Sequence, residues 1–149
     1  MYKRILVPLD GSKLAEIALP HAESLAQQYN AELVLLQVVQ PPTIPGQGST
    51  ELILYQKTME SLIKKTEDYL AGLKGEFREK SITTRTRVGL GPVVDEIVET
   101  ADAQDAELVI IASHGRSGLG RVFFGSVASG VLNRIEHPLL IIRCPEEVS

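Results

Sequence analysis

Short apolar runs alternate along the chain with longer stretches in which apolar residues recur every three or four positions. The apolar runs occupy residues 4–9, 33–39, 106–112 and 139–143, and a more polar run rich in threonine occupies residues 81–88. Continuous apolarity is typical of strands that are covered on both faces, as in parallel sheets. The pattern therefore predicts five strands, of which the third lies at a wetter edge of the sheet.

Helical periodicity fills the intervals between the predicted strands. A first helix is predicted over residues 14–29, with Pro20 either kinking it or separating its first turn. A regular apolar stripe predicts a long helix over residues 51–75. This stripe of about three heptads could form a coiled coil, but packing on the sheet is the simpler interpretation. Two shorter helices are predicted, one after Pro92 and one over residues 126–136.

The alternation of strands and helices predicts a single α/β domain over residues 1–149, with a parallel sheet between two helical layers. Residues capable of chemistry follow the first and fourth strands. Ligands of doubly wound sheets bind at the carboxyl ends of the strands, where the strand order reverses, so these two strands are expected to be neighbours. The prediction is a Rossmann-like three-layer sandwich with strand order 3-2-1-4-5.

The segment 112–127, A-S-H-G-R-S-G-L-G-R-V-F-F-G-S-V, joins the fourth predicted strand to the last predicted helix. Its glycines allow the backbone to approach a ligand closely, and the N-terminus of the helix favours negative charge. His114 and Arg116 add hydrogen-bonding or cationic side chains, and no Asp or Glu lies between Ser113 and Ser126. The segment is therefore predicted to be a phosphate-binding loop.

The charge balance limits the classes of ligand. With 15 basic and 19 acidic residues the net charge is −4, which argues against a broad nucleic-acid or membrane surface. The basic groups of the loop are a local exception, a pattern suited to a small anionic ligand. The single cysteine, Cys144, excludes an intramolecular disulfide and fits a reducing compartment. No signal-peptide pattern opens the chain, and a cytoplasmic location is expected.

Individual site residues leave alternatives open. Asp10 could accept hydrogen bonds from a sugar hydroxyl or an adenine amine, or it could form the turn before Gly11 and help to cap the first helix. Ser126 could donate to a terminal phosphate, cap the last helix, or do both. His114 could contact a phosphate or bond the backbone at the end of its strand.

Several enzyme signatures are absent from the sequence. It has no G-x-x-x-x-G-K-[ST] loop and no G-x-S-x-G elbow, and its three histidines show no metal-binding spacing. No catalytic base is assigned by sequence. Any hydrolysis of a bound nucleotide is therefore expected to be slow.

The sequence resembles the universal stress proteins over essentially its whole length. The resemblance rests on I-L-V-P-L-D-G-S near the start and on S-H-G-R-S-G-L followed by G-S-V at residues 125–127. The ATP-binding branch of that family carries Gly-x2-Gly-x9-Gly-Ser/Thr. The last three elements fall on Gly115, Gly125 and Ser126, whereas Ala112 replaces the first glycine.

The resemblance implies an adenine nucleotide alpha hydrolase-like fold that binds ATP or another adenine nucleotide, with Mg²⁺ or Mn²⁺ held through the phosphates. It also implies a homodimer formed through the last strand, whose ends are Leu139 and Arg143. The residues that would surround the nucleotide are Pro8, Asp10 and Val38 at adenine and ribose, Ala112, Gly115 and Arg116 at ribose and phosphates, and Gly125, Ser126 and Val127 at the outer phosphates.

The leading hypothesis is a homodimeric stress or regulatory protein that senses an adenine nucleotide. Two alternatives remain at this point. The first is a nucleotide-independent interaction module, which Ala112 favours and the intact Gly125 and Ser126 disfavour. The second is a weak ATPase or an autophosphorylating protein.

Overall fold

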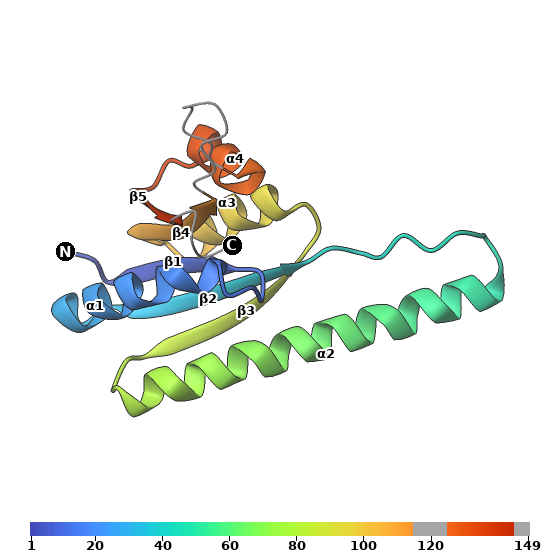
Figure 1. The fold of residues 1–149 in the computed structure, drawn as a ribbon, viewed down its shortest axis with the longest axis horizontal. Helices are drawn as coiled ribbons and strands as arrows, with labels where there is room; N and C mark the ends of the chain where they lie inside the picture. Colours follow the sequence, from blue (N-terminus) through green and yellow to red (C-terminus); the bar gives the residue numbers. More distant parts are fainter. Residues whose placement is uncertain (115–124, 145–149) are drawn as a thin grey trace.

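The computed structural model of the chain describes residues 1–114 and 125–144 (Figure 1). They contain one five-stranded sheet in the order β3-β2-β1-β4-β5, and every pairing between neighbouring strands is parallel. The predicted α/β class and strand order are confirmed. The strands are β1 (Arg4–Leu9), β2 (Glu32–Val39), β3 (Thr84–Leu90), β4 (Leu108–His114) and β5 (Leu139–Cys144).

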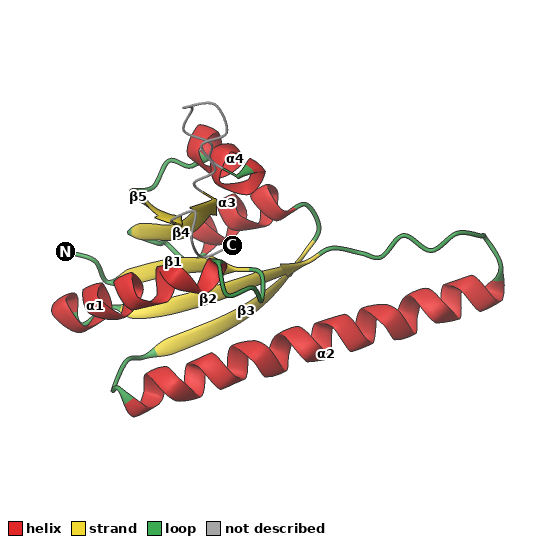
Figure 2. Cartoon of the chain, viewed as in Figure 1, coloured by secondary structure: helices red, strands yellow, loops and turns green. Residues whose placement is uncertain are grey.

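Helices cover both faces of the sheet (Figure 2). One face carries the 3-10 segment η1 (Ala15–Ala18), α1 (Leu19–Tyr29) and α2 (Ser49–Glu79), and the other carries α3 (Val93–Ala103) and α4 (Ser126–Arg134). Side chains alternate across the sheet, so Val7 packs under η1 and α1 while Leu6 packs under α3 and α4. Two hydrophobic cores result, one on each face.

The separate segment η1 precedes α1, whose second residue is Pro20, so a separate first turn, one of the two outcomes predicted for Pro20, is observed. The proline lies in the first turn of α1, where its missing N–H would have no intrahelical partner in any case. At the other end, α1 stops at Asn30, which adopts the left-handed conformation with φ of 52°. Asparagine tolerates this conformation better than most residues.

The predicted end of the long helix at Gly75 is wrong, because α2 continues to Glu79. Its end is a Schellman motif, in which the Ile82 N–H donates to the Phe77 carbonyl and Ser81 is left-handed with φ of 59°. Phe77 and Ile82 are both buried in the same core. The hydrophobic contact beyond Gly75 therefore extends the helix past the glycine.

Other boundaries shift by a few residues. β3 runs three residues later than its predicted start and includes Gly89 and Leu90, which were predicted as a turn. The turn lies instead at Gly91, which has φ of 121°. α4 ends at Arg134 because Ile135 is extended, with ψ of 137°.

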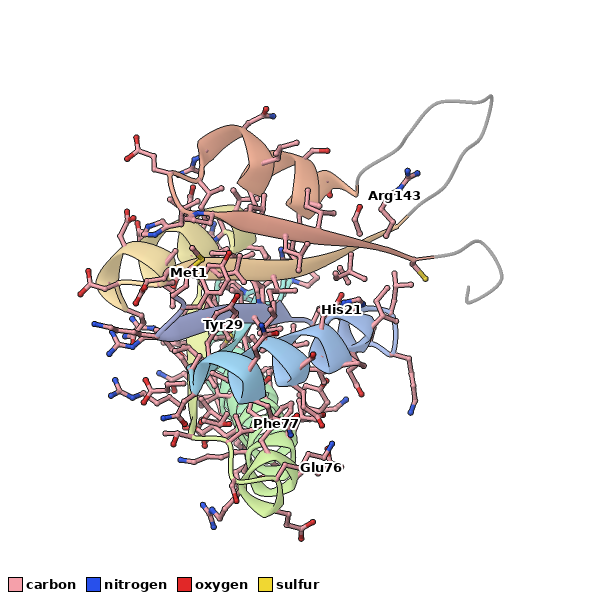
Figure 3. The ribbon with its side chains drawn as sticks, turned by 90° about the vertical axis from the view of Figure 1, so that its left-hand side faces the viewer. Met1, His21, Tyr29, Glu76, Phe77 and Arg143 are labelled. Atoms are coloured by element: carbon pink, nitrogen blue, oxygen red, sulfur yellow. The ribbon has the colours of Figure 1, made fainter. Side chains whose placement is uncertain are left out.

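The first half of α2 extends beyond the end of the strands, as Figure 1 shows. Every buried residue of this helix lies in its second half, at Thr66, Leu70, Leu73 and Phe77. Figure 3 looks at this end of the helix and shows Phe77 beneath the sheet. The interpretation that the whole helix packs on the sheet is therefore wrong for its first half. Among the described helices, α2 included, none combines the length and the apolarity that a membrane crossing requires.

Candidate functional site

A cleft of about 410 Å³ opens at the carboxyl ends of β1 and β4. β1 lies between β2 and β4, so the order of the strands reverses at this point. Residues from β1, β2 and β4 line the cleft together with the first turns of α3 and α4 and the start of η1. Doubly wound sheets hold their ligands at this position.

The N-terminus of α4 forms one end of the cleft. Ser126, Val127 and Ala128 all line it, and the N–H groups of this first helical turn have no partner within the helix. The preceding Gly125 N–H donates to the Oγ of Ser113 at 3.2 Å, and Ser113 is only 2% exposed. This bond ties the start of the helix to the end of β4, so the helix N-terminus is held toward the cleft.

Asp10 lies at the mouth of the cleft and forms a turn. Its Oδ1 accepts hydrogen bonds from the Ser12 N–H at 2.9 Å and the Ser12 hydroxyl at 2.5 Å, and Ser12 Oγ in turn accepts from the Ala15 N–H at 3.1 Å. The turn-forming role that the sequence left open is therefore present. Oδ2 receives no hydrogen bond from the part of the chain that the structure describes, so Asp10 keeps an acceptor for a ligand.

Most of the predicted site residues lie together around this one cleft. His114 is the last residue of β4, and its side chain lies outside the described part of the structure, as do Gly115 and Arg116 altogether. The predicted residues that line the cleft are Pro8, Asp10, Val38, Ala112, Gly125, Ser126 and Val127.

Sequence reasoning missed most of the apolar wall of the cleft. The missed apolar residues are Leu9, Leu14, Ala15, Leu36, Val93, Ile97, Ile111 and Ala128, and the missed polar residues are Gln40 and Ser113. Val93 and Ile97 carried a weak signal, since α3 begins just after the carboxyl end of β3 and its first turn had to lie near the other strand ends. Apolar periodicity alone could not distinguish these residues from the core.

The cleft has few ionisable groups. Asp10 is the one acidic residue among the described residues that line it, and no cluster of three or more His, Cys, Asp or Glu side chains occurs in residues 1–114 or 125–144. Nearby, burial and a 2.9 Å hydrogen bond to Glu16 raise the pKa of Tyr69, so its hydroxyl stays protonated and links α2 to η1. The described residues thus offer hydrogen-bond donors and an apolar wall, without a metal cage or an acid–base pair.

The strand order and the strand-end cleft define the doubly wound α/β class of proteins. Within that class, the model of the universal stress protein family matches residues 1–143. The chain therefore belongs to the universal stress protein family.

Individual relatives cover the chain almost completely. The universal stress protein MJ0531 of Methanocaldococcus jannaschii is 31% identical, over 99% of this chain and 85% of the relative. The solved structure of MJ0577, a universal stress protein of the same organism, is 26% identical with a TM-score of 0.79, covering 98% of this chain and 99% of that one.

Two more distant structures share the fold and carry ligands. A universal stress protein in complex with cAMP is 23% identical, with a TM-score of 0.64 and coverage of 97% and 98% of the two chains. A family member from Arabidopsis thaliana with AMP bound is 14% identical, with a TM-score of 0.69 and coverage of 98% and 94%.

Proposed function

We propose that the cleft binds an adenine nucleotide, with ATP as the first candidate, and that the protein is a homodimeric, nucleotide-responsive regulator of the stress response in the cytoplasm. The observation that carries this proposal is the combination, within one cleft, of an apolar wall and a helix N-terminus. An adenine base needs the first and phosphates need the second.

The apolar wall suits a planar base. Val38 of β2 and Val93 at the start of α3 are partly exposed, so two elements offer apolar surface to the same space, while Leu36 and Ile97, which also border it, are buried. At the mouth of this region, Asp10 Oδ2 accepts no hydrogen bond from the described residues. We assign that oxygen to a ribose hydroxyl or to the adenine amine, both of which are hydrogen-bond donors.

The start of α4 suits the phosphates. Its first N–H groups, which have no partner within the helix, and its dipole favour negative charge, and the exposed Ser126 hydroxyl can donate one more hydrogen bond. A divalent ion fits only as part of the nucleotide complex, because the described lining residues supply a single carboxylate. Mg²⁺ or Mn²⁺ would then be held by the phosphates and water.

The comparisons support the class of ligand. Universal stress proteins with cAMP and with AMP have the same fold as this chain. In those proteins the ligand is an adenine nucleotide, and the cleft described above has the features that such a ligand needs. His114, Gly115 and Arg116 remain proposed contacts to the ribose and phosphates.

The proposed dimer uses β5. It is the last strand of the sheet, paired on one side to β4, and its residues Leu139 to Ile142 are only partly buried. An apolar edge strand of this kind needs a cover, and pairing with β5 of a second copy would provide one.

Calorimetric titration of the full chain with Mg-ATP tests the proposal. We expect saturable binding, and we expect Ser126→Ala to weaken it about tenfold, the loss of about 1.5 kcal/mol for one hydrogen bond to a charged group. Ser49→Ala is the matched control, since Ser49 is also the exposed first residue of a helix and lies outside the cleft. Absence of binding at millimolar Mg-ATP would remove the proposal.

The same proteins separate binding from turnover. Incubation with ATP labelled on the terminal phosphate should release no phosphate and leave no label on the chain, because the described cleft residues include no acid–base pair. Release that Ser126→Ala abolishes would instead favour the ATPase alternative.

A further inference from the structure

The first half of α2, residues 49–65, forms an arm that extends beyond the sheet (Figure 1). No residue of the arm is buried. Three consecutive apolar residues, Leu52, Ile53 and Leu54, are more than half exposed. Helices in proteins owe most of their stability to the packing of an apolar face, so an uncovered helix of this composition indicates a missing partner.

The apolar residues of the arm follow a heptad pattern. Leu52 and Met59 occupy one of the two core positions of the heptad, and Tyr55 and Leu62 occupy the other. The stripe continues into Thr66, Tyr69 and Leu73, where the helix reaches the sheet. The arm therefore prolongs the packing face of α2 into a region where the chain offers it no sheet.

The preceding loop does not fill this face. Residues 44–48 border the arm near Leu52 and Tyr55, and an open hollow of about 480 Å³ remains between them. The loop therefore leaves part of the apolar side of the arm near Leu52 and Tyr55 uncovered.

We propose that the arm pairs with the arm of a second copy of this chain as a short antiparallel coiled coil. In the two-fold symmetric arrangement, Leu52 of one copy packs on Leu62 of the other, and Tyr55 packs on Met59. Each of these two contacts occurs twice, once on either side of the two-fold axis, so the apolar stripe of the arm is complementary to the same stripe of a second copy. A closed two-fold contact requires this property.

The charges of the arm select the antiparallel direction. Glu51 lies near its start, and Lys64 and Lys65 lie at its end. Antiparallel pairing brings Glu51 of each copy to the level of Lys65 of the other, at flanking positions of the heptad. Parallel pairing would place like charges at the same level.

Association through the arms is compatible with the proposed β5 dimer. α2 packs against β3 and β2, whereas β5 is the opposite edge of the sheet. Two copies that pair through β5 carry their α2 helices on the two outer edges of the joined sheet, so the arms of these two copies cannot reach each other. A chain that uses both surfaces therefore assembles beyond a dimer.

Light scattering coupled to size-exclusion chromatography of the full chain tests the pairing. Leu52→Glu should halve the mass of the assembly at equal protein concentration. Leu54→Glu should leave the mass unchanged, because Leu54 has nearly the same exposure, 53% against 58%, but lies two residues away on another side of the helix. Equal losses in both variants, or none in either, would overturn the proposal. Circular dichroism checks that both variants stay folded.

Disulfide trapping then tests the direction. Both cysteine variants, Leu52→Cys and Leu62→Cys, are made in a chain that also carries Cys144→Ser. Each variant alone should resist cross-linking, because residue 52 of one copy lies about 15 Å along the helix pair from residue 52 of the other, and the same holds for residue 62. An equimolar mixture should cross-link rapidly under mild oxidation into the mixed dimer. Cross-linking of Leu52→Cys with itself, or no cross-linking in the mixture, would overturn antiparallel pairing of the arms.

Discussion

Gly130 of α4 sets the distance between α3 and α4, the two helices whose first turns line the cleft. A Cβ added at this position would lie 2.7 Å from Val94 Cγ2 and 3.3 Å from Val94 Cγ1. Non-bonded carbon atoms do not approach this closely, and valine in a helix is nearly confined to one rotamer. Gly130→Ala must therefore push α4 away from α3.

The size of the effect follows from two opposing contributions. Replacing glycine by alanine inside a helix stabilises it by about 1 kcal/mol. Overpacking a close contact costs about 1 to 3 kcal/mol, so we expect a net loss of about 1 kcal/mol for Gly130→Ala. Gly72→Ala is the control, because Gly72 lies inside α2 with nothing within 4 Å of the added Cβ. That variant should gain about 1 kcal/mol.

Urea unfolding followed by circular dichroism measures both variants. The two identical chemical changes should shift the free energy of unfolding in opposite directions, and in thermal unfolding the two variants should have melting temperatures separated by about 4 to 8 °C. Stabilisation of Gly130→Ala to the same extent as Gly72→Ala would refute the close packing of α3 on α4. Displacement of α4 should also weaken nucleotide binding, because its first turn lines the cleft.

Two further predictions concern the cleft and the turn before β5. Ser113→Ala should cost about 1 kcal/mol of stability, since it removes the acceptor of the Gly125 N–H, and calorimetry should show weaker Mg-ATP binding. The pKa of His137 is raised from 6.5 by its hydrogen bond to Asp102, with Glu136 adding to the effect. The resulting stabilisation is complete below about pH 6.5 and is lost as the pH rises through the higher folded-state pKa. Urea unfolding at about pH 6 and pH 8 should show this loss in the wild type and a smaller one in His137→Gln.

The strand order could be predicted because polar residues stand at the ends of two apolar runs. Asp10 ends the first and Ser113 lies near the end of the fourth, and a doubly wound sheet brings such ends together. Helix ends were harder to predict. Gly75 costs α2 about 1 kcal/mol as an interior glycine, whereas burial of Phe77 contributes about 1.5 to 3 kcal/mol, so the tertiary contact decides where the helix ends.

The apolar wall and the arm show the same limit of sequence reasoning. Val93 and Ile97 lie on the apolar face of α3, and periodicity identifies such a face without showing whether protein or open space lies opposite it. The stripe of α2 is continuous, yet the sheet covers only its second half. The sheet covers only the second half of α2 because its strands are much shorter than this helix, and the apolar pattern of the helix does not reveal where the sheet ends.

Chemical-shift mapping of the nitrogen-15-labelled chain with Mg-ATP tests the central claim most directly, since it reports both binding and place. We predict saturable shifts of the backbone amides around Asp10, Ala112 and Ser126, which line one cleft from three different elements of the chain. Shifts confined to the basic hollow of Lys74 and Arg78 at the other end of the sheet, or no shifts at millimolar nucleotide, would contradict it.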